Sequence, residues 1–180
     1  MIKFGLAALA VLALAACSGG DSESGVMREI ERVDTEQAQS AEDGAAFLER
    51  TRAEAGVEAL PSGLLLKVVS RGSNQSLPRP SAAAQVLVHY EGKLADGSVF
   101  DSSFARNEPA QFPLQAVVPG FSEAIQHMRP GDEIVATFPM ELGYGPQGRP
   151  PVIPPAAPLQ FRIVLLAFQE PGGQVVNAPQ

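Results

Sequence analysis

The sequence predicts an α+β domain in which an antiparallel β-sheet of about five strands curls over one short α-helix. Three observations lead to this fold class: runs of alternating apolar residues begin at residue 64, a single helical stripe lies between residues 119 and 128, and residues 143–158 are rich in proline and glycine. The chain has 180 residues, which is about one domain plus additional chain. A helical or flexible arm is expected before the domain.

The strands are predicted from period-two patterns and from β-branched residues. In residues 85–94, Val86, Val88 and Tyr90 share one face. Ala95-Asp96-Gly97 follows as a tight turn, because Asp-Gly supplies the positive φ angle that a hairpin needs. The five predicted strands are residues 64–70, 85–94, 99–102, 133–138 and 159–168.

One helix is predicted to interrupt the strands. Pro119 suits a first helical turn, and Phe121, Ala124, Ile125 and Met128 then form one apolar stripe that must pack on the sheet. Pro130-Gly131 ends it. The later stretch 143–158 can be neither helix nor central strand, so we expect a long structured loop, which at that length is usually functional.

The N-terminus reads as a secretion signal. Lys3 precedes about 13 apolar residues, 4–16, whereas a membrane-spanning helix needs roughly 20. Leu14-Ala15-Ala16-Cys17 resembles the bacterial lipobox, and Cys17 is the only cysteine. We therefore expect 1–16 to be a lipoprotein signal peptide and Cys17 to be lipidated; the alternative is a plain signal with an incidental cysteine. Ser18 favours sorting to the outer membrane, facing the periplasm.

Residues 17–60 are predicted to be an acidic tether with a linker helix over 41–56 that stops at Gly56. Residues 18–60 hold 11 acidic residues and 4 arginines, whereas 61–180 hold 9 acidic and 8 basic residues. The arm is then a solvated spacer, the remnant of a dimerisation helix, or a recruiter of a partner. The nearly neutral domain, 61–170, offers no basic surface for nucleic acid, and 171–180 is expected to be a flexible tail.

Several chemistries are excluded by the motifs. Residues 143–148 match Gly-x-Gly-x-x-Gly, but Arg149-Pro150-Pro151 follows in place of the helix that a dinucleotide site requires. No Gly-x-Ser-x-Gly elbow is present. His89 and His127 lack metal-ligand spacing with other residues. We predict no metal and no cofactor.

A series of short motifs carries the functional signal. Aromatic and aliphatic residues recur at strand ends and around the long loop; alone, they would equally suit a small β core. Their order and spacing resemble those of the FKBP-type peptidyl-prolyl cis-trans isomerases. The motifs that carry the resemblance are residues 88–94, 96–97, 100–103, 117–121, 144–145, 153–155 and 159–161. The resemblance extends from 47 to 168, and residues 47–64 are similar to the lead-in of the bacterial Mip-like branch.

The resemblance implies an active-site pocket. Catalytic positions fall on Asp101, Tyr144, Tyr90 and Phe161, and substrate-binding positions on Phe100, Arg106, Phe112, Val117, Val118, Phe121 and Ile153. The Tyr144 hydroxyl would bond a substrate carbonyl, and the Ile153 backbone N–H would grip the peptide. Asp101 would orient the pocket or stabilise the twisted amide; alternatively, it only pairs with Arg106.

Three positions depart from the family pattern. Phe121 replaces the usual tryptophan floor, Ala110 replaces an aromatic wall residue, and Arg149 stands at a position that is often histidine. These changes bear on potency and inhibitor affinity more than on the reaction.

The resemblance implies an isomerase that helps proteins fold in the bacterial envelope. Its partners would be proline-containing unfolded chains or peptides, a membrane reached through the lipid anchor, and macrolide inhibitors of the rapamycin type. Only about 40 residues separate Cys17 from the domain, so a monomer is favoured over a dimer. The alternative is a non-catalytic peptide-binding module or holdase chaperone on the same fold.

Overall fold

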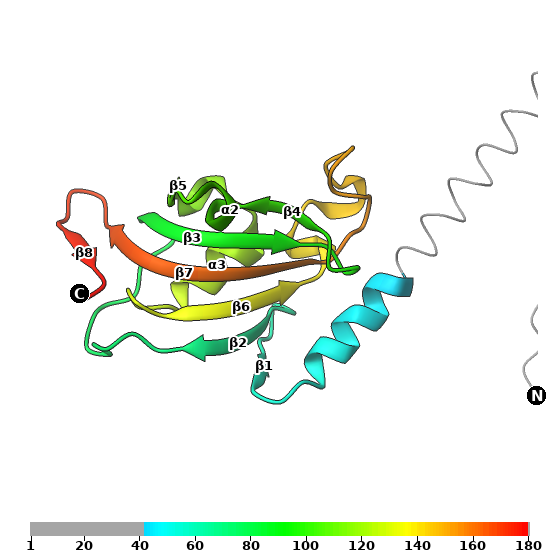
Figure 1. Ribbon diagram of the computed structural model, residues 1–180, viewed down its shortest axis with the longest axis horizontal. Helices are drawn as coiled ribbons and strands as arrows, with labels where there is room; N and C mark the ends of the chain where they lie inside the picture. The colour runs from blue at the N-terminus through cyan, green and yellow to red at the C-terminus, as the bar shows by residue number, and fades with distance from the viewer. Residues whose placement is uncertain (1–41, 180) are drawn as a thin grey trace, which may run out of the picture. The chain divides into compact units, whose positions relative to one another are not determined.

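The structure is a computed structural model that describes residues 42–179 (Figure 1). The predicted signal peptide, Cys17 and most of the acidic arm lie outside the described residues. A helix occupies residues 42–52, so the helix predicted over 41–56 ends earlier. Gly56 has φ of 81° and lies in the turn that follows. Within residues 42–179, no helix combines the length and apolar character needed to cross a membrane.

The strands form one antiparallel sheet in the order β1-β2-β6-β7-β3-β4, with β5 paired to β3 and β8 paired to β7. The predicted fold class is confirmed. The strands are β1 (Val57–Ala59), β2 (Leu65–Ser70), β3 (Gln85–Lys93), β4 (Val99–Ser102), β5 (Ala110–Pro113), β6 (Glu133–Phe138), β7 (Leu159–Gln169) and β8 (Val175–Asn177).

The five predicted strands correspond to β2, β3, β4, β6 and β7, and three short strands were not predicted. β1 and β8 have three residues each, too few to show a period-two pattern. β5 ends in Pro113 and contains Ala110, which are poor strand formers. β8 also changes the expectation for the C-terminus, because Val175, Val176 and Asn177 pair with β7 in the stretch that was expected to be a flexible tail.

The predicted central helix is α3 (Pro119–Gln126). It lies against the curved sheet in Figure 1, and its stripe is buried: Ala124 and Ile125 are fully buried, as is Met128 just beyond its end. The remaining helical segments are α2 (Ser103–Arg106) and the 3-10 turns η1 (Leu114–Ala116), η2 (Met140–Leu142) and η3 (Gly145–Gln147). A helix of eight residues is unstable alone, so burial against the sheet holds α3 in place.

The sheet contributes the other half of the core. On β3, Val86, Val88 and Tyr90 are buried while their neighbours are more exposed. On β7, Leu159, Phe161, Ile163, Leu165 and Ala167 are likewise buried. This alternation is the predicted period-two pattern, and it turns one face of each strand towards α3.

A buried carboxylate fixes the connection between β2 and β3. Asp132 is fully buried. Its oxygens accept hydrogen bonds from the backbone N–H groups of Gly72 (2.8 Å) and Arg129 (3.0 Å), and from the side chains of Gln75 and Arg71 (2.9 Å each). Burial alone would raise the pKa of Asp132, but these four donors hold it below its ordinary value.

Candidate active site

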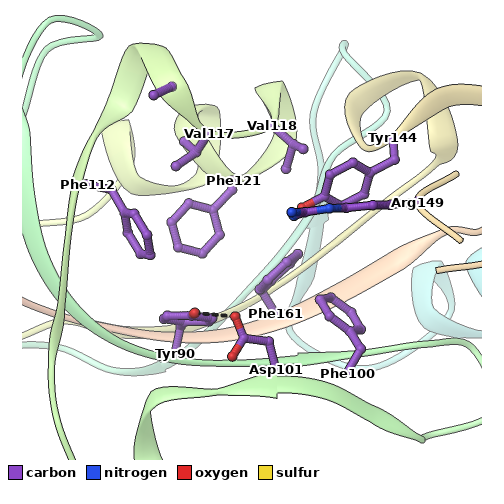
Figure 2. A pocket seen from close by; sticks show the side chains of 11 residues that line it. Tyr90, Phe100, Asp101, Phe112, Val117, Val118, Phe121, Tyr144, Arg149 and Phe161 are labelled. Carbon is purple, nitrogen blue, oxygen red and sulfur yellow. Dashed lines mark hydrogen bonds between the residues drawn. The ribbon is translucent and has the colours of Figure 1, made fainter. Parts of the chain in front are cut away.

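A hollow of about 300 Å³ opens between α3, the β3–β4 pair and the loop that follows β6. Figure 2 shows its side chains converging on one space from elements far apart in the sequence. All of the predicted site residues except Arg106 and Ile153 line it. The lining residues are Tyr90, Phe100, Asp101, Phe112, Ala116, Val117, Val118, Phe121, Tyr144, Arg149 and Phe161.

Phe121 forms the floor of this pocket. It is 4% exposed, and three other rings meet it edge-on: Phe161 at 5.1 Å between centroids, Tyr90 at 6.0 Å and Phe112 at 6.2 Å. Edge-to-face contacts at these distances are the favoured arrangement of aromatic pairs. The floor is therefore aromatic and well supported although it lacks an indole N–H.

A glycine beneath the pocket wall sets the position of two further rings. Phe100 meets Phe161 edge-on at 5.5 Å, and both rings lie directly over Gly92 of β3. A Cβ atom on Gly92 would come within 2.5 Å of Phe100 Cζ and 2.9 Å of Phe161 Cε1. Gly92 was not among the predicted site residues, although a glycine inside a strand pattern is a known sign of close approach.

The polar wall is a cluster of three side chains. The Tyr90 hydroxyl donates a short hydrogen bond to Asp101 Oδ2, and Arg106 Nη1 donates to Asp101 Oδ1 at 2.5 Å. Arg106 Nη2 also donates to the Tyr90 hydroxyl oxygen at 3.3 Å. The expected Asp101–Arg106 pair is thus present, and it holds the rim of the aromatic pocket.

This cluster fixes the protonation states of its members. Burial alone would raise the pKa of Asp101, but the hydrogen bonds from Tyr90 and Arg106 hold it below the ordinary value. Burial, together with the neighbouring carboxylate, raises the pKa of Tyr90. At neutral pH the wall therefore consists of a carboxylate, a neutral phenol that donates to it and a guanidinium.

Local capping brings Arg106 to this wall. Ser102 ends β4 and caps α2, its Oγ accepting from the Ala105 N–H at 3.2 Å. Ser103 Oγ accepts from the Tyr90 N–H at 2.8 Å and donates to the Tyr90 carbonyl at 3.2 Å, which ties α2 to β3. Asn107, at φ 51°, ends the helix. The short helix thus brings the Arg106 guanidinium back to the carboxylate of Asp101, five residues earlier in the chain.

A second hollow of about 270 Å³ adjoins the first. The two hollows share Phe100, Asp101, Tyr144 and Arg149, and the second adds Pro150, Val152 and Ile153 from the long loop. The predicted functional loop therefore forms one side of a continuous groove. Tyr144 stands where the two hollows meet.

The backbone donors differ from expectation in one respect. The Ile153 N–H, expected to grip a peptide, donates to the Arg149 carbonyl at 3.0 Å, and Ile153 lines the second hollow. Val118, the N-cap of α3, lines the main pocket. Its N–H donates no hydrogen bond within the described residues, whereas that of Ile153 is occupied.

Ala110 does not line the pocket. It is the first residue of β5, pairs with Val88 and packs against the core, while Phe112 two residues later presents its ring to the pocket. Across residues 42–179, no three His, Cys, Asp or Glu side chains are grouped to hold a metal ion. The groove is thus an apolar, aromatic recess with a polar rim, which suits an apolar ring flanked by peptide groups.

Comparison with known proteins identifies the family of this chain. Residues 78–166 match the family model described as FKBP-type peptidyl-prolyl cis-trans isomerase. The chain is 42% identical over 145 residues to the FKBP-type 22 kDa peptidyl-prolyl cis-trans isomerase of Escherichia coli, covering 78% of this chain and 69% of the relative. It is also 42% identical over 131 residues to the peptidyl-prolyl cis-trans isomerase Mip of Coxiella burnetii, covering 73% of this chain and 56% of that protein.

Solved structures show the same likeness. The crystal structure of FkpA from Escherichia coli superposes with a TM-score of 0.68 at 32% identity, covering 91% of this chain and 75% of that chain. A peptidyl-prolyl cis-trans isomerase from Pseudomonas syringae superposes with a TM-score of 0.67 at 31% identity, covering 77% and 96%. The chain belongs to the family of FKBP-type peptidyl-prolyl cis-trans isomerases.

Proposed function

We propose that this chain accelerates rotation about X-Pro peptide bonds and that the proline ring sits in the hollow floored by Phe121. The observation that carries the proposal is the joining of an aromatic recess of about 300 Å³ to a polar rim formed by Asp101, Tyr90 and Arg106. A proline ring packs well against aromatic faces, and the rim meets the polar groups on either side of it.

The reaction requires little chemistry from the protein. Amide resonance sets a barrier of roughly 18–20 kcal/mol to rotation, and X-Pro bonds exchange isomers in tens to hundreds of seconds. A catalyst only has to favour the twisted amide over the planar one. Water stabilises the planar amide because that form is polar, so removing water from the bond disfavours the planar form. Acceleration by 10⁴ corresponds to about 5.5 kcal/mol, within reach of desolvation plus two directed hydrogen bonds.

The donors are assigned from the geometry. Tyr144 stands between the two hollows, where its hydroxyl would bond a substrate carbonyl while the X-Pro bond turns. The Val118 N–H is directed by the start of α3, and donors at a helix N-terminus favour an oxygen with partial negative charge. Together these two groups hold the flanking carbonyls during the rotation.

Asp101 is proposed to orient the pocket and to stabilise the polarised twisted amide, not to transfer a proton. Its carboxylate already accepts hydrogen bonds from Tyr90 and Arg106, and its lowered pKa makes it a poor base. The variant Arg106→Gln separates an electrostatic role of Asp101 from a structural one, because it keeps the Asp101 carboxylate but removes its ion-pair partner.

The test is cis-to-trans isomerisation of a short X-Pro peptide by residues 18–180. We compare the native protein with Tyr144→Phe, Asp101→Asn and Arg106→Gln, each checked for folding by circular dichroism. We expect clear loss of activity in the first two. If Arg106→Gln loses as much as Asp101→Asn, the carboxylate acts by holding the wall. Full activity in both Tyr144→Phe and Asp101→Asn would refute the assignment, and no acceleration by folded native protein would favour the binding-module or holdase alternative.

We also propose that the protein works in the bacterial envelope, held to a membrane through a lipid on Cys17. The lipobox-like Leu14-Ala15-Ala16-Cys17 supports this. A single acyl chain gives only reversible binding, whereas two or more give stable anchoring. The same pocket is proposed to take macrolides of the rapamycin type, and a monomer is proposed as the working state.

A further inference from the structure

Arg149 is a cation in the substrate groove that the proposed reaction leaves without a role. It lines both hollows of the groove. Figure 2 shows its side chain extended beside the Tyr144 ring, with the guanidinium turned towards the space between Val118 and Phe161. The guanidinium carbon lies 6.0 Å from the Tyr144 ring centroid. A cation therefore lies beside the ring of Tyr144, whose hydroxyl we assign to the substrate carbonyl.

The protein holds this residue in place by its backbone. The Arg149 N–H donates to the Ile153 carbonyl at 2.8 Å, and the Arg149 carbonyl accepts from the N–H groups of Val152 at 3.2 Å and Ile153 at 3.0 Å. The contact with the Tyr144 ring then orients the guanidinium. The backbone of Arg149 is thus fixed at the groove, and its exposed side chain lies beside the Tyr144 ring.

No carboxylate of the described residues neutralises it. The ion pairs formed within residues 42–179 do not include Arg149. The carboxylate of the groove, Asp101, is already bonded to Arg106 and Tyr90. Arg106 lines neither hollow but balances the Asp101 carboxylate, so Arg149 remains as the cation of the second hollow.

We propose that Arg149 is a specificity-determining residue that favours substrates with an acidic side chain next to the proline. A proline in the first hollow places its neighbours along the groove, where the second hollow of about 270 Å³ has room for a side chain. A glutamate there meets a guanidinium that forms no ion pair within residues 42–179, and a guanidinium suits carboxylates because of its planar set of donors. This inference rests on the proposed isomerase function.

The expected effect is modest because the pair would be exposed. Ion pairs of this kind correspond to about a two- to fivefold preference. The preference should depend on salt, because the field of an exposed charge decays over about 10 Å at 0.1 M ionic strength and over a shorter distance at higher salt. Native protein should therefore prefer glutamate to glutamine at low salt, and the preference should shrink towards unity at 0.5 M NaCl.

The experiment measures kcat/KM for four peptides with glutamate or glutamine, immediately before or after the proline. The native protein is compared with Arg149→Gln, Arg149→Glu and Arg149→Lys. We expect Glu/Gln ratios of about two to five for native protein in at least one position, near one for Arg149→Gln, below one for Arg149→Glu and partly kept for Arg149→Lys. Arg79→Gln makes the same charge change at an exposed site that lines neither hollow and should keep the native ratio.

The outcomes separate this inference from the proposed function. Acceleration of the glutamine peptides tests the isomerase activity itself and does not depend on the charge of Arg149. If native protein accelerates those peptides but shows equal rates for glutamate and glutamine in both positions, the specificity inference is overturned and the function stands. A ratio that persists unchanged in Arg149→Gln and Arg149→Glu would overturn it equally. Without acceleration of any peptide by folded protein, the function fails and this inference fails with it.

Discussion

Adding one methyl group to Gly92 should damage the pocket more than it damages the fold. The new Cβ would lie 2.5 Å from Phe100 Cζ and 2.9 Å from Phe161 Cε1. Carbon atoms pack best at about 3.5–4.0 Å, so the Phe100 ring must move by about 1 Å or more. Phe161 is only 5% exposed, whereas Phe100 is partly exposed and can turn outwards into solvent.

The magnitudes follow from these contacts. Overpacking by a methyl costs roughly 1–3 kcal/mol, and replacing a strand glycine by alanine regains about 0.5–1 kcal/mol. We therefore expect Gly92→Ala to lower the free energy of unfolding by about 1–2 kcal/mol. A displacement of 1 Å at a reacting site can cost about 10² in rate, so kcat/KM should fall about ten- to a hundredfold.

The assays are urea unfolding and peptide isomerisation, with Gly173→Ala as the control. An added Cβ at Gly173 meets its nearest atom, Glu170 Cβ, at 3.4 Å, so neither quantity should change. In a Phe100→Ala background the stability cost of Gly92→Ala should fall, because only the contact with Phe161 remains. Full activity in Gly92→Ala, or the same stability cost in both backgrounds, would refute the steric reasoning.

Three further outcomes are expected. Asp132→Asn should lower the free energy of unfolding by about 2–4 kcal/mol. Because the folded pKa of Asp132 is depressed, its contribution to stability is fully present above about pH 4 and is lost as the pH falls through the folded pKa. The free energy of unfolding of the variant should therefore depend less on pH between 5 and 2 than that of the native protein. Tyr90→Phe should lower the free energy of unfolding by about 1 kcal/mol. This is the low end for a hydrogen bond to a charged group, because the Asp101 side chain is 41% exposed and water can replace the phenol. A loss above 3 kcal/mol in urea unfolding would contradict this. Cys17→Ser should abolish incorporation of radiolabelled palmitate and release the protein from membranes on fractionation, and membrane association unchanged by the substitution would count against a lipid anchor.

The long elements could be predicted from the sequence because their burial is periodic. The alternation on β3 and the stripe from Phe121 to Met128 are set by local spacing, and the structure buries those residues. β5 and β8 could not be predicted in this way, because their pairing depends on β3 and β7 lying beside them. Short strands of this kind are defined by their partners and not by their own residues.

The site divides along the same line. The aromatic residues and Asp101 could be placed through a family resemblance, and the structure brings all of the catalytic candidates into one pocket. Two features depend on three-dimensional contacts that no spacing reveals. One is the fit of two rings over Gly92. The other is the occupation of the Ile153 N–H by the Arg149 carbonyl, whereas the Val118 N–H donates no hydrogen bond within residues 42–179.

The order of strands in the sheet has a consequence for how the chain is made. β1, β2 and β6 form one ribbon and β3, β4 and β5 another, and the long pairings that join them all belong to β7. β7 is the last long strand to leave the ribosome, and it carries Phe161 of the pocket. The two ribbons must therefore wait, unjoined, until about residue 169 has emerged, a non-local closure of the kind that slows folding. The hollow that Phe161 lines is therefore completed only after β7 has joined the two ribbons.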